Sequence, residues 1–385
     1  RTRGLFNMDP AVVLVAGCYE QITFGYRVET TKEVSNIDIF YLSFHVVADF
    51  THHAHSASLS VVATNEKFIA TGSRDETICL YDMKKRTEHG ALLHHDGTIT
   101  CLEFYGSSHL LSGGEDGLIC IWSTKKWECL QSIKAHKGQV SSFSVHPSGK
   151  LALSVGTDRT LRTWNLIDGR SAFIKNIKEN AHIVLWSPAG DKYVVVADNK
   201  IDVYSLETAT VTRAILNQKR ISSVKFVTNS IVAVAGDEEC LRLYDTDSGV
   251  CLSQFKAHEN RVKALSSFTV DDCHILASAS NDGYIKMWKL NLEQIKDPPV
   301  LLGEVNTTAR LACLDVWQCS SQKRTLNREE ATASSPVTEK EDKPAQTKKG
   351  RPACTGEVVE VEDSDSPAKK RKTDGSKRKK KQKNP

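Results

Sequence analysis

The chain has 385 residues, of which 40% are hydrophobic and 25% charged, and its formal net charge is +4. No apolar run approaches the roughly 18 residues that a membrane-spanning helix needs, so the composition predicts a soluble protein without a transmembrane helix. The 11 cysteines are scattered without a C-x-x-C pair, which favours reduced thiols over disulfides or zinc and predicts no metal and no cofactor.

The N-terminal region predicts a short leader followed by strands. Residues 1–10 are expected to lie outside the fold, and acidic Asp9 with Pro10 argues against a targeting peptide. Strands are predicted from three apolar or alternating segments, VVLVAG (12–17), ITFGYRV (22–28) and FHVVADF (44–50). The stretch TTKEVSNIDIF (30–40) between them is predicted to be an insertion that forms a surface loop.

A pattern of four side chains then occurs four times. In each unit a Ser or Thr lies four residues before an Asp, an aromatic residue lies six after it, and a His lies 20 to 24 before it. The four sets are His55, Thr71, Asp75 and Tyr81; His95, Ser112, Asp116 and Trp122; His136, Ser154, Asp158 and Trp164; and His258, Ser278, Asp282 and Trp288. Ser, His and Asp are the members of a hydrolase triad, but an active site would occur once. The repetition therefore predicts a structural element and no enzyme.

The spacing of the closing aromatic residues identifies the repeat. Through two weaker units that end at Tyr204 and Tyr244, the steps from Tyr81 to Trp288 are 41, 42, 40, 40 and 44 residues, which matches the period of WD40 blades. Within one repeat, alternation and turn signals predict strands at Val140 to Val145, at Leu151 to Val155 and around Leu161. In the WD-repeat proteins that this pattern resembles, the His, hydroxyl, Asp and aromatic side chains form one buried hydrogen-bonded chain.

Two repeats depart from the pattern. In the fourth, Val194 takes the place of the hydroxyl residue and His182 falls inside a predicted strand; in the fifth, Glu238 stands where the turn Asp is expected. Either these blades have drifted while their neighbours hold them in place, or they bind a partner.

The two ends of the chain are predicted to build the seventh blade together. ARLACLDVW (309–317) has the pattern of an inner strand with no strands after it, and we expect it to pair with the N-terminal strand. The sequence thus predicts an all-β, seven-bladed WD40 propeller over residues 11–318. Deleting either end should open the ring, and a protease-resistant, monomeric 44–300 fragment would contradict this.

Loops that carry the His and Asp residues meet on one rim of such a propeller. Large polar residues beside these anchors are the candidate contacts, namely Arg74, Glu115, Arg261 and Asn281. The alternative is that they are ordinary solvated loop residues, since contacts concentrate in a small fraction of a surface. No cluster among them is typical of a metal or phosphate site.

Residues 319–385 are predicted to form a disordered tail, because they are polar and nearly free of aromatic residues. The tail holds 18 of the 51 Lys and Arg and 11 of the 47 Asp and Glu, a net +7, which leaves the remainder at −3. An acidic segment (357–367) precedes a basic one (368–385), and in the acidic segment Val358, Val359 and Val361 resemble a SUMO-interaction motif.

The basic segment has the form of a nuclear import signal that importin would bind. Its cations are Lys369, Lys370, Arg371, Lys372, Lys377, Arg378, Lys379, Lys380 and Lys381. The alternatives are a solvated charge run or an arm that contacts RNA, since phosphate contacts need only mobile cations. Import and RNA contact both predict the nucleus.

Several segments together carry a closer resemblance. LVAGCYEQITFGY, DFTHHAH, LSGGEDGLICIW, KKWECLQSIKAHKGQV and HPSGKLALSVGTDRTLRTWNL resemble the PAK kinase-interacting WD-repeat family of vertebrates over the whole propeller. The resemblance implies a nucleolar protein needed for maturation of the large ribosomal subunit, which also binds and restrains a kinase activated by Rho-family GTPases. The tail departs from the family in detail and is shorter.

Two function hypotheses follow. In the first, the propeller is a non-enzymatic scaffold for pre-ribosomal proteins or pre-rRNA, monomeric within a larger assembly and not bound to membrane, and the basic tail delivers it to the nucleolus. In the second, it is a signalling adaptor that occupies the regulatory domain of a PAK-type kinase and keeps it inactive. Neutralising Lys369 to Lys381 should impair only the first function.

Overall fold

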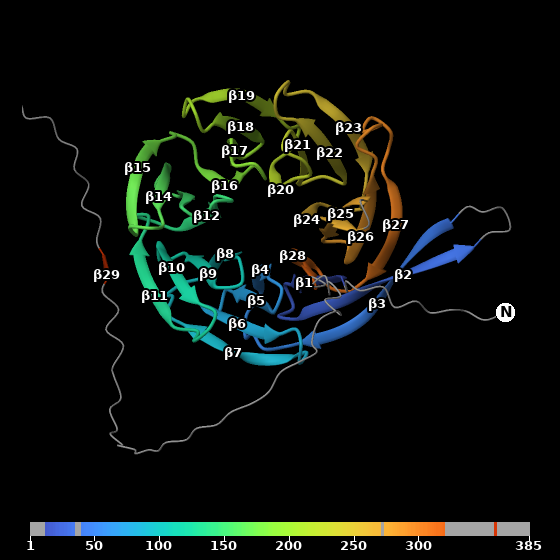
Figure 1. Cartoon of the computed structure of the whole chain (residues 1–385), viewed down its shortest axis with the longest axis horizontal. Coiled ribbons are helices and arrows are strands. Elements are labelled where there is room, and N and C mark those ends of the chain that lie inside the picture. Colours follow the sequence, from blue (N-terminus) through green and yellow to red (C-terminus); the bar gives the residue numbers. More distant parts are fainter. Residues whose placement is uncertain (1–11, 35–39, 271–272, 320–357, 360–385) are drawn as a thin grey trace, which may run out of the picture.

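The computed structural model describes residues 12–34, 40–270, 273–319 and 358–359. Seven sheets follow one another around a central axis, and each contains four antiparallel strands that are consecutive in the sheet (Figure 1). The described residues form no helix, and so none that could cross a membrane. The prediction of an all-β, seven-bladed propeller is confirmed.

Six blades are built from consecutive stretches of chain, and each runs from a strand at the centre to one at the outside (Figure 1). Blade 1 contains β4 (Leu59–Thr64), β5 (Phe68–Ser73), β6 (Thr77–Asp82) and β7 (Thr87–Leu93). Blade 2 contains β8 (Ile99–Tyr105), β9 (His109–Gly114), β10 (Leu118–Ser123) and β11 (Cys129–Lys134). Blade 3 contains β12 (Val140–Val145), β13 (Leu151–Gly156), β14 (Thr160–Asn165) and β15 (Arg170–Asn176).

The next three blades repeat the same order. Blade 4 contains β16 (Ala181–Trp186), β17 (Lys192–Ala197), β18 (Lys200–Ser205) and β19 (Val211–Leu216). Blade 5 contains β20 (Ile221–Phe226), β21 (Ile231–Gly236), β22 (Cys240–Asp245) and β23 (Cys251–Lys256). Blade 6 contains β24 (Val262–Val270), β25 (Cys273–Ser280), β26 (Tyr284–Leu290) and β27 (Val300–Asn306).

Blade 7 joins the two ends of the propeller. Its strand order is β28 (Leu311–Gln318), β1 (Val12–Cys18), β2 (Thr23–Val34) and β3 (Phe40–His52). β28 and β1 are antiparallel, with Val12 opposite Gln318 and Ala16 opposite Leu314. The predicted closure of the ring by strands from both ends is confirmed.

The predicted surface loop at residues 30–40 is wrong over most of its length. β2 and β3 remain paired from Thr30 opposite Phe44 to Val34 opposite Phe40. The reason is propensity, because the paired stretches are rich in Thr, Val, Phe and Tyr, which favour extended backbone even beyond the body of a sheet. Figure 1 shows this hairpin extending outward from the ring. Residues 35–39 lie outside the described residues.

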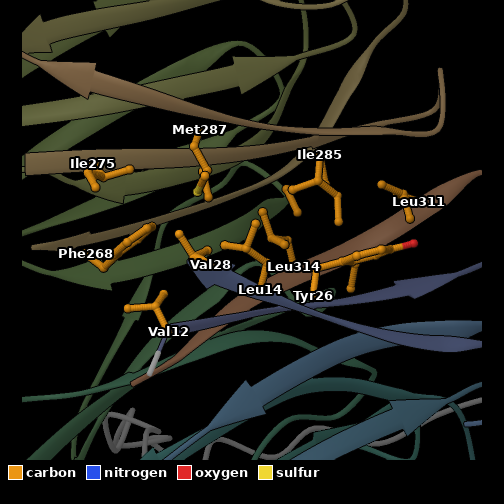
Figure 2. Packing of buried hydrophobic residues seen from close by; sticks show 14 of the residues in the cluster. Val12, Leu14, Tyr26, Val28, Phe268, Ile275, Ile285, Met287, Leu311 and Leu314 are labelled. Carbon is orange, nitrogen blue, oxygen red and sulfur yellow. The ribbon is translucent and has the colours of Figure 1, made fainter. Parts of the chain in front are cut away.

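Strand β1 is buried on both faces, which explains why VVLVAG is apolar at every position rather than at alternate ones. Val12 and Leu14 pack toward blade 6, where Figure 2 shows them with Phe268 and Met287. Val13 and Val15 pack toward blade 1. Since full burial of one such side chain contributes about 1.5–3 kcal/mol, β1 contributes much of the energy that closes the ring.

Most of the predicted tail and all of the predicted leader (1–10) lie outside the described residues. Within the tail, the structure describes Cys319 and a two-residue strand, β29 (Val358–Val359). β29 runs parallel to β11 at the outer edge of blade 2, with Val358 opposite Ser132 and Val359 opposite Ile133. Two members of the SUMO-like motif therefore form a strand, while Val361 lies outside the described residues.

Candidate functional site

Three blades hold the predicted His, Ser, Asp and Trp side chains in one continuous hydrogen-bonded chain. In blade 3, His136 Nε2 lies 2.7 Å from Ser154 Oγ, and His136 Nδ1 lies 2.9 Å from Asp158 Oδ1. The indole N–H of Trp164 donates to the same Ser154 oxygen at 2.9 Å. The same contacts join His95, Ser112, Asp116 and Trp122 in blade 2 and His258, Ser278, Asp282 and Trp288 in blade 6.

The network of blade 1 is shorter. His55 bridges Thr71 Oγ1, at 2.8 Å, and Asp75 Oδ2, at 3.1 Å. The hydroxyl of Tyr81 is buried without a hydrogen-bond partner among the described residues, whereas Trp donates in the other three blades. A phenol at this position therefore fills space but does not extend the chain.

The Asp residues of these networks stay ionised. Burial disfavours the charge on Asp75, but hydrogen bonds from Thr77 and from the backbone N–H of Ser56 outweigh it and lower the pKa of Asp75 to about 2. A similar balance of burial against hydrogen bonds holds the pKa of Asp116, Asp158 and Asp282 below the usual range.

The hydroxyl groups of the networks cannot act as nucleophiles. Thr71, Ser112, Ser154 and Ser278 have no exposed surface, so a substrate could not reach them. Each Ser oxygen also accepts the indole N–H of the blade's Trp. The networks satisfy buried polar groups and fix the turns that carry the Asp residues.

Blade 4 replaces the polar network with apolar and aromatic packing. Ile177 occupies the position of the network His, four residues before the inner strand. Val194 was predicted at the hydroxyl position, but it packs toward blade 5, and Val195 shares the face of Tyr204 instead. The physical reason is that the turn between β17 and β18 is one residue shorter than its counterpart in blade 3. Tyr204 stacks on Tyr193 at 5.0 Å between ring centroids.

His182 lies in the inner strand of blade 4, as the sequence indicated. Burial lowers the pKa of His182, so its ring is neutral near pH 7. Its Nε2 donates to the carbonyl oxygen of Ile221 in blade 5 at 2.8 Å. This residue therefore links two inner strands rather than belonging to a network within its own blade.

Blade 5 uses a different polar network. Asn217 occupies the His position, and its Oδ1 accepts from Arg242 Nη1 at 2.9 Å and from the Tyr244 hydroxyl at 3.1 Å. Arg242 Nη1 also pairs with Glu238, the residue found in place of the turn Asp. The sequence singled out Glu238 and Tyr244 but gave no signal for Asn217 and Arg242, because only the distance between strands shows that they meet.

A cavity of about 350 Å³ opens where the central channel reaches the rim formed by these turns. Four cationic side chains line it, from Arg74, Arg220, Arg261 and Lys263, together with one carboxylate, from Asp237. We call this cavity the channel mouth. It lies on the rim that the sequence predicted for binding.

The four predicted rim contacts divide between the channel mouth and its surroundings. Arg74 and Arg261 line the mouth. Asn281 holds Arg261: its amide oxygen accepts from Arg261 Nε at 2.6 Å when its amide nitrogen donates to the Leu311 carbonyl. Glu115 is exposed on blade 2 and is not among the residues that line the mouth.

The channel mouth is a local concentration of positive charge. In the part of the chain that the structure describes, Arg74, Arg220 and Lys263 have no carboxylate at ion-pair distance, whereas nearby Arg310 pairs with Glu20 at 3.1 Å. This contrasts with the net charge of −3 over residues 1–318. Unpaired cations that converge on a concave site attract carboxylates and phosphates.

Sequence reasoning missed Arg220 and Lys263. Arg220 and Arg261 both stand immediately before an inner strand, in NQKR and HENR. Aligning the repeats on the start of the inner strand, rather than on the closing aromatic residue, would have shown this shared position.

Comparison with a protein-family model separates the blades that hold the His, hydroxyl, Asp and aromatic set from those that do not. The model of the family "WD domain, G-beta repeat" matches residues 45–82, 87–123, 127–165 and 249–289. These are the four stretches that hold the His, hydroxyl, Asp and aromatic sets, whereas all of blade 4 and the three inner strands of blade 5 are not matched.

Several individual proteins are similar to this chain over most of its length. The chain is 60% identical over 373 residues to the "p21-activated protein kinase-interacting protein 1-like" protein of Danio rerio, with 97% of each chain covered. It belongs to the p21-activated protein kinase-interacting protein 1 family. The human protein of that name is 58% identical over 332 residues, which cover 86% of this chain and 83% of the human one. "Shk1 kinase-binding protein 15" of Schizosaccharomyces pombe is 26% identical over 285 residues, covering 73% and 80%.

In this member of the p21-activated protein kinase-interacting protein 1 family, the predicted import and RNA-binding cations (Lys369 to Lys381) lie outside the described residues. The channel mouth and the blade networks are therefore the parts of the predicted site whose geometry the structure gives.

Proposed function

We propose that this protein is a non-enzymatic scaffold that binds and restrains a PAK-type protein kinase and that also acts in large ribosomal subunit assembly and pre-rRNA processing in the nucleolus. The observation that supports the kinase partner most is the 58–60% identity, over most of the chain, to proteins named for interaction with a p21-activated kinase. The proposed ribosomal role is supported by the family resemblance and by the basic tail.

We place the main protein contact at the channel mouth. Arg74, Arg220 and Lys263 lack ion-pair partners among the described residues, so an incoming acidic segment would form charge-assisted hydrogen bonds without breaking existing ones. The mouth is the end of the central channel, with which it shares Ser60, His182 and Lys263. This shape suits the side chains of an acidic or phosphorylated protein segment better than the backbone of a nucleic acid, which needs an extended track of cations.

The basic tail has a separate role in the proposal. Its cations would bind importin for entry into the nucleus and would then strengthen attachment to pre-rRNA. A second candidate function is a kinase-binding adaptor without a ribosomal role, and the names of the human and Schizosaccharomyces pombe relatives, which refer to a kinase partner, favour it.

Gradient sedimentation of tagged protein from a nuclear extract, probed beside large-subunit precursor RNA and the kinase, tests the proposal. The first variant carries Arg220→Glu and Arg261→Glu at the channel mouth. The second neutralises Lys369 to Lys372. The control is Lys84→Glu with Lys85→Glu, which reverses the same number of charges in a turn on the opposite rim.

We expect wild-type and control protein to sediment with precursor particles and to co-purify with the kinase. The mouth variant should lose its protein partners, and the tail variant should lose the particles but keep the kinase. Sedimentation of wild-type protein only with the kinase would favour the adaptor function. If the mouth variant keeps its partners, the main protein contact does not lie at the channel mouth.

A further inference from the structure

Three side chains with metal-binding atoms meet at the outer junction of blades 1 and 2. His94 lies in the connection from β7 to β8, Cys120 lies on β10, and Cys129 begins β11. A ring nitrogen of His94 and the two Sγ atoms all lie within 4.8 Å of one another. Among the described residues, no other set of three His, Cys, Asp or Glu side chains meets this condition.

The pairing of β10 with β11 brings the two thiols together. Cys120 lies opposite Ser132 and Trp122 lies opposite Cys129, with a bulge in the ladder between them. Because Cys120 and Trp122 are two residues apart on one strand, their side chains share a face, and Cys129 joins them there. The Sγ atoms of Cys120 and Cys129 therefore lie within 4.8 Å of each other.

The third side chain, from the connection between blades 1 and 2, is also held in place. The His94 ring meets the Trp122 ring edge-on, at 5.9 Å between centroids. The next residue, His95, is fixed by hydrogen bonds to Ser112 and Asp116. Both contacts limit the movement of His94, so the three donors converge without any large rearrangement.

Two thiolates and one imidazole are the donors that zinc prefers. With Zn–S near 2.3 Å and Zn–N near 2.0 Å, donors around a tetrahedral ion lie about 3.5–3.8 Å apart, and a separation within 4.8 Å needs only small side-chain shifts to reach this. Cys120 is fully buried, Cys129 is half-buried and His94 is exposed, so the fourth position of a tetrahedron faces solvent.

We propose that His94, Cys120 and Cys129 bind one zinc ion, with a water molecule as the fourth ligand. Each thiol loses its proton to solvent as its sulfur binds the metal, so two protons are released for each ion bound. Two thiolates balance the charge of Zn²⁺, which leaves a neutral centre in a partly buried place. The ion would tie the connection between blades 1 and 2 to the two outer strands of blade 2.

The sequence predicted no metal because its cysteines form no C-x-x-C pair. The proposed ligands are separated by 26 and 9 residues, and they come from the connection between blades 1 and 2 and from two strands of blade 2. Only the fold brings them together, so a search for short metal-binding motifs could not find them.

Cobalt(II) is a direct probe of the proposed site. Metal-free full-length protein, kept reduced with a phosphine, is titrated with Co²⁺ and followed by absorption spectroscopy. We expect the visible bands of a tetrahedral complex and a thiolate-to-cobalt charge-transfer band, both saturating at one ion per chain and disappearing when Zn²⁺ is added. Zinc should also raise the thermal unfolding temperature of the wild-type protein.

Three variants assign the ligands. Cys129→Ser and His94→Gln should each weaken zinc binding by more than about 100-fold, measured by competition with a chromophoric chelator. Neither residue is fully buried, so both variants should fold. Cys251→Ser, which changes an exposed cysteine on β23 of blade 5, is the matched control and should bind zinc as the wild type does. Absence of stoichiometric binding, or binding that persists unchanged in both ligand variants, would overturn the proposal.

Discussion

Blades 2 and 3 differ from blades 4 and 5 in both their interior and their contribution to the channel mouth. Blades 2 and 3 hold complete His, Ser, Asp and Trp networks, and none of their residues lines the mouth. Blades 4 and 5 lack these networks, and they supply His182, Arg220 and Asp237 to the mouth. The mouth therefore draws on the irregular blades 4 and 5 as well as on blades 1 and 6, which keep their His and Asp anchors.

The difference shows that a blade needs satisfied buried groups rather than one particular set of residues. Blade 4 removes the need for hydrogen bonds by using Ile177 and Val195, and blade 5 replaces His with Asn217 and pairs Glu238 with Arg242. At the positions of the network residues, neither solution leaves a buried polar side chain without a partner among the described residues. Because a repeat also gains stability from its neighbours, these blades tolerate a change that leaves their loops available for binding.

The largest expected effect is the loss of one network carboxylate. Asp158→Asn in blade 3 places an amide where His136, Lys137 and Thr160 offer donors, and should lower the free energy of unfolding by about 2–3 kcal/mol. Asp198→Asn is the same change in the corresponding turn of blade 4, and it should alter the free energy of unfolding by no more than about 0.5 kcal/mol. Urea denaturation of the two variants measures the difference, and equal losses would show that the two kinds of blade do not depend on different interactions.

A smaller effect is expected from the ion pair of blade 5. Arg242→Met leaves Glu238 without its cationic partner and should lower the free energy of unfolding by about 1–2 kcal/mol. The loss is limited because Glu238 is near enough to the surface to regain some hydration. Adding Glu238→Gln should recover part of the loss, since the isolated charge is then absent. If the double variant is as unstable as the sum of the single ones, the network is not a coupled unit.

The repeated parts of the molecule could be predicted from the sequence, and the individual parts could not. The period of the closing aromatic residues from Tyr81 to Trp288 predicted six blades, the strands at the two ends predicted the seventh, and the alternation at Val140–Val145 predicted the bounds of β12. Arg242 and Asn217 were missed because 25 residues separate them and no second copy of the pair exists. Val195 was missed because a single residue lost from a turn changes which side chain faces the preceding blade.

The two mouth residues that the sequence identified, Arg74 and Arg261, both lie beside network anchors. Arg220 lies in a blade without the network His, so selecting large polar residues beside the His and Asp anchors could not identify it. The prediction of a binding rim therefore depended on the regular blades, whereas part of the charge at the channel mouth comes from an irregular one.

The pH dependence of stability should separate the networks from the rest of the ring. The folded-state pKa of Asp158 lies below its ordinary value, so the unfolded chain takes up a proton first as the pH falls. The stabilisation is complete above about pH 4 and is lost as the pH falls through the folded-state value. We expect the difference in free energy of unfolding between wild type and Asp158→Asn, measured by urea titration, to become smaller below pH 4. A difference that grows there would contradict the predicted direction of the pH dependence.

The smallest expected effect concerns Glu103, on the inner strand of blade 2, which faces Lys225 of blade 5 inside the channel. Burial raises the pKa of Glu103 to about 7, and Lys225 opposes this rise. An acid whose folded-state pKa is raised loses stability as the pH increases from its unfolded value of about 4.5 through 7.

Glu103→Gln keeps an oxygen that can accept the Val145 N–H and removes the charge. It should therefore stabilise the protein by about 1 kcal/mol at pH 8 and have no such benefit below pH 4.5. Glu128→Gln, which changes an exposed glutamate of the same blade, is the control. Lys225→Met should raise the pKa of Glu103 further and increase the gain from Glu103→Gln, because the positive charge that favours the carboxylate is gone. If Lys225→Met leaves that gain unchanged, the regular and irregular sides of the ring are not coupled electrostatically across the channel.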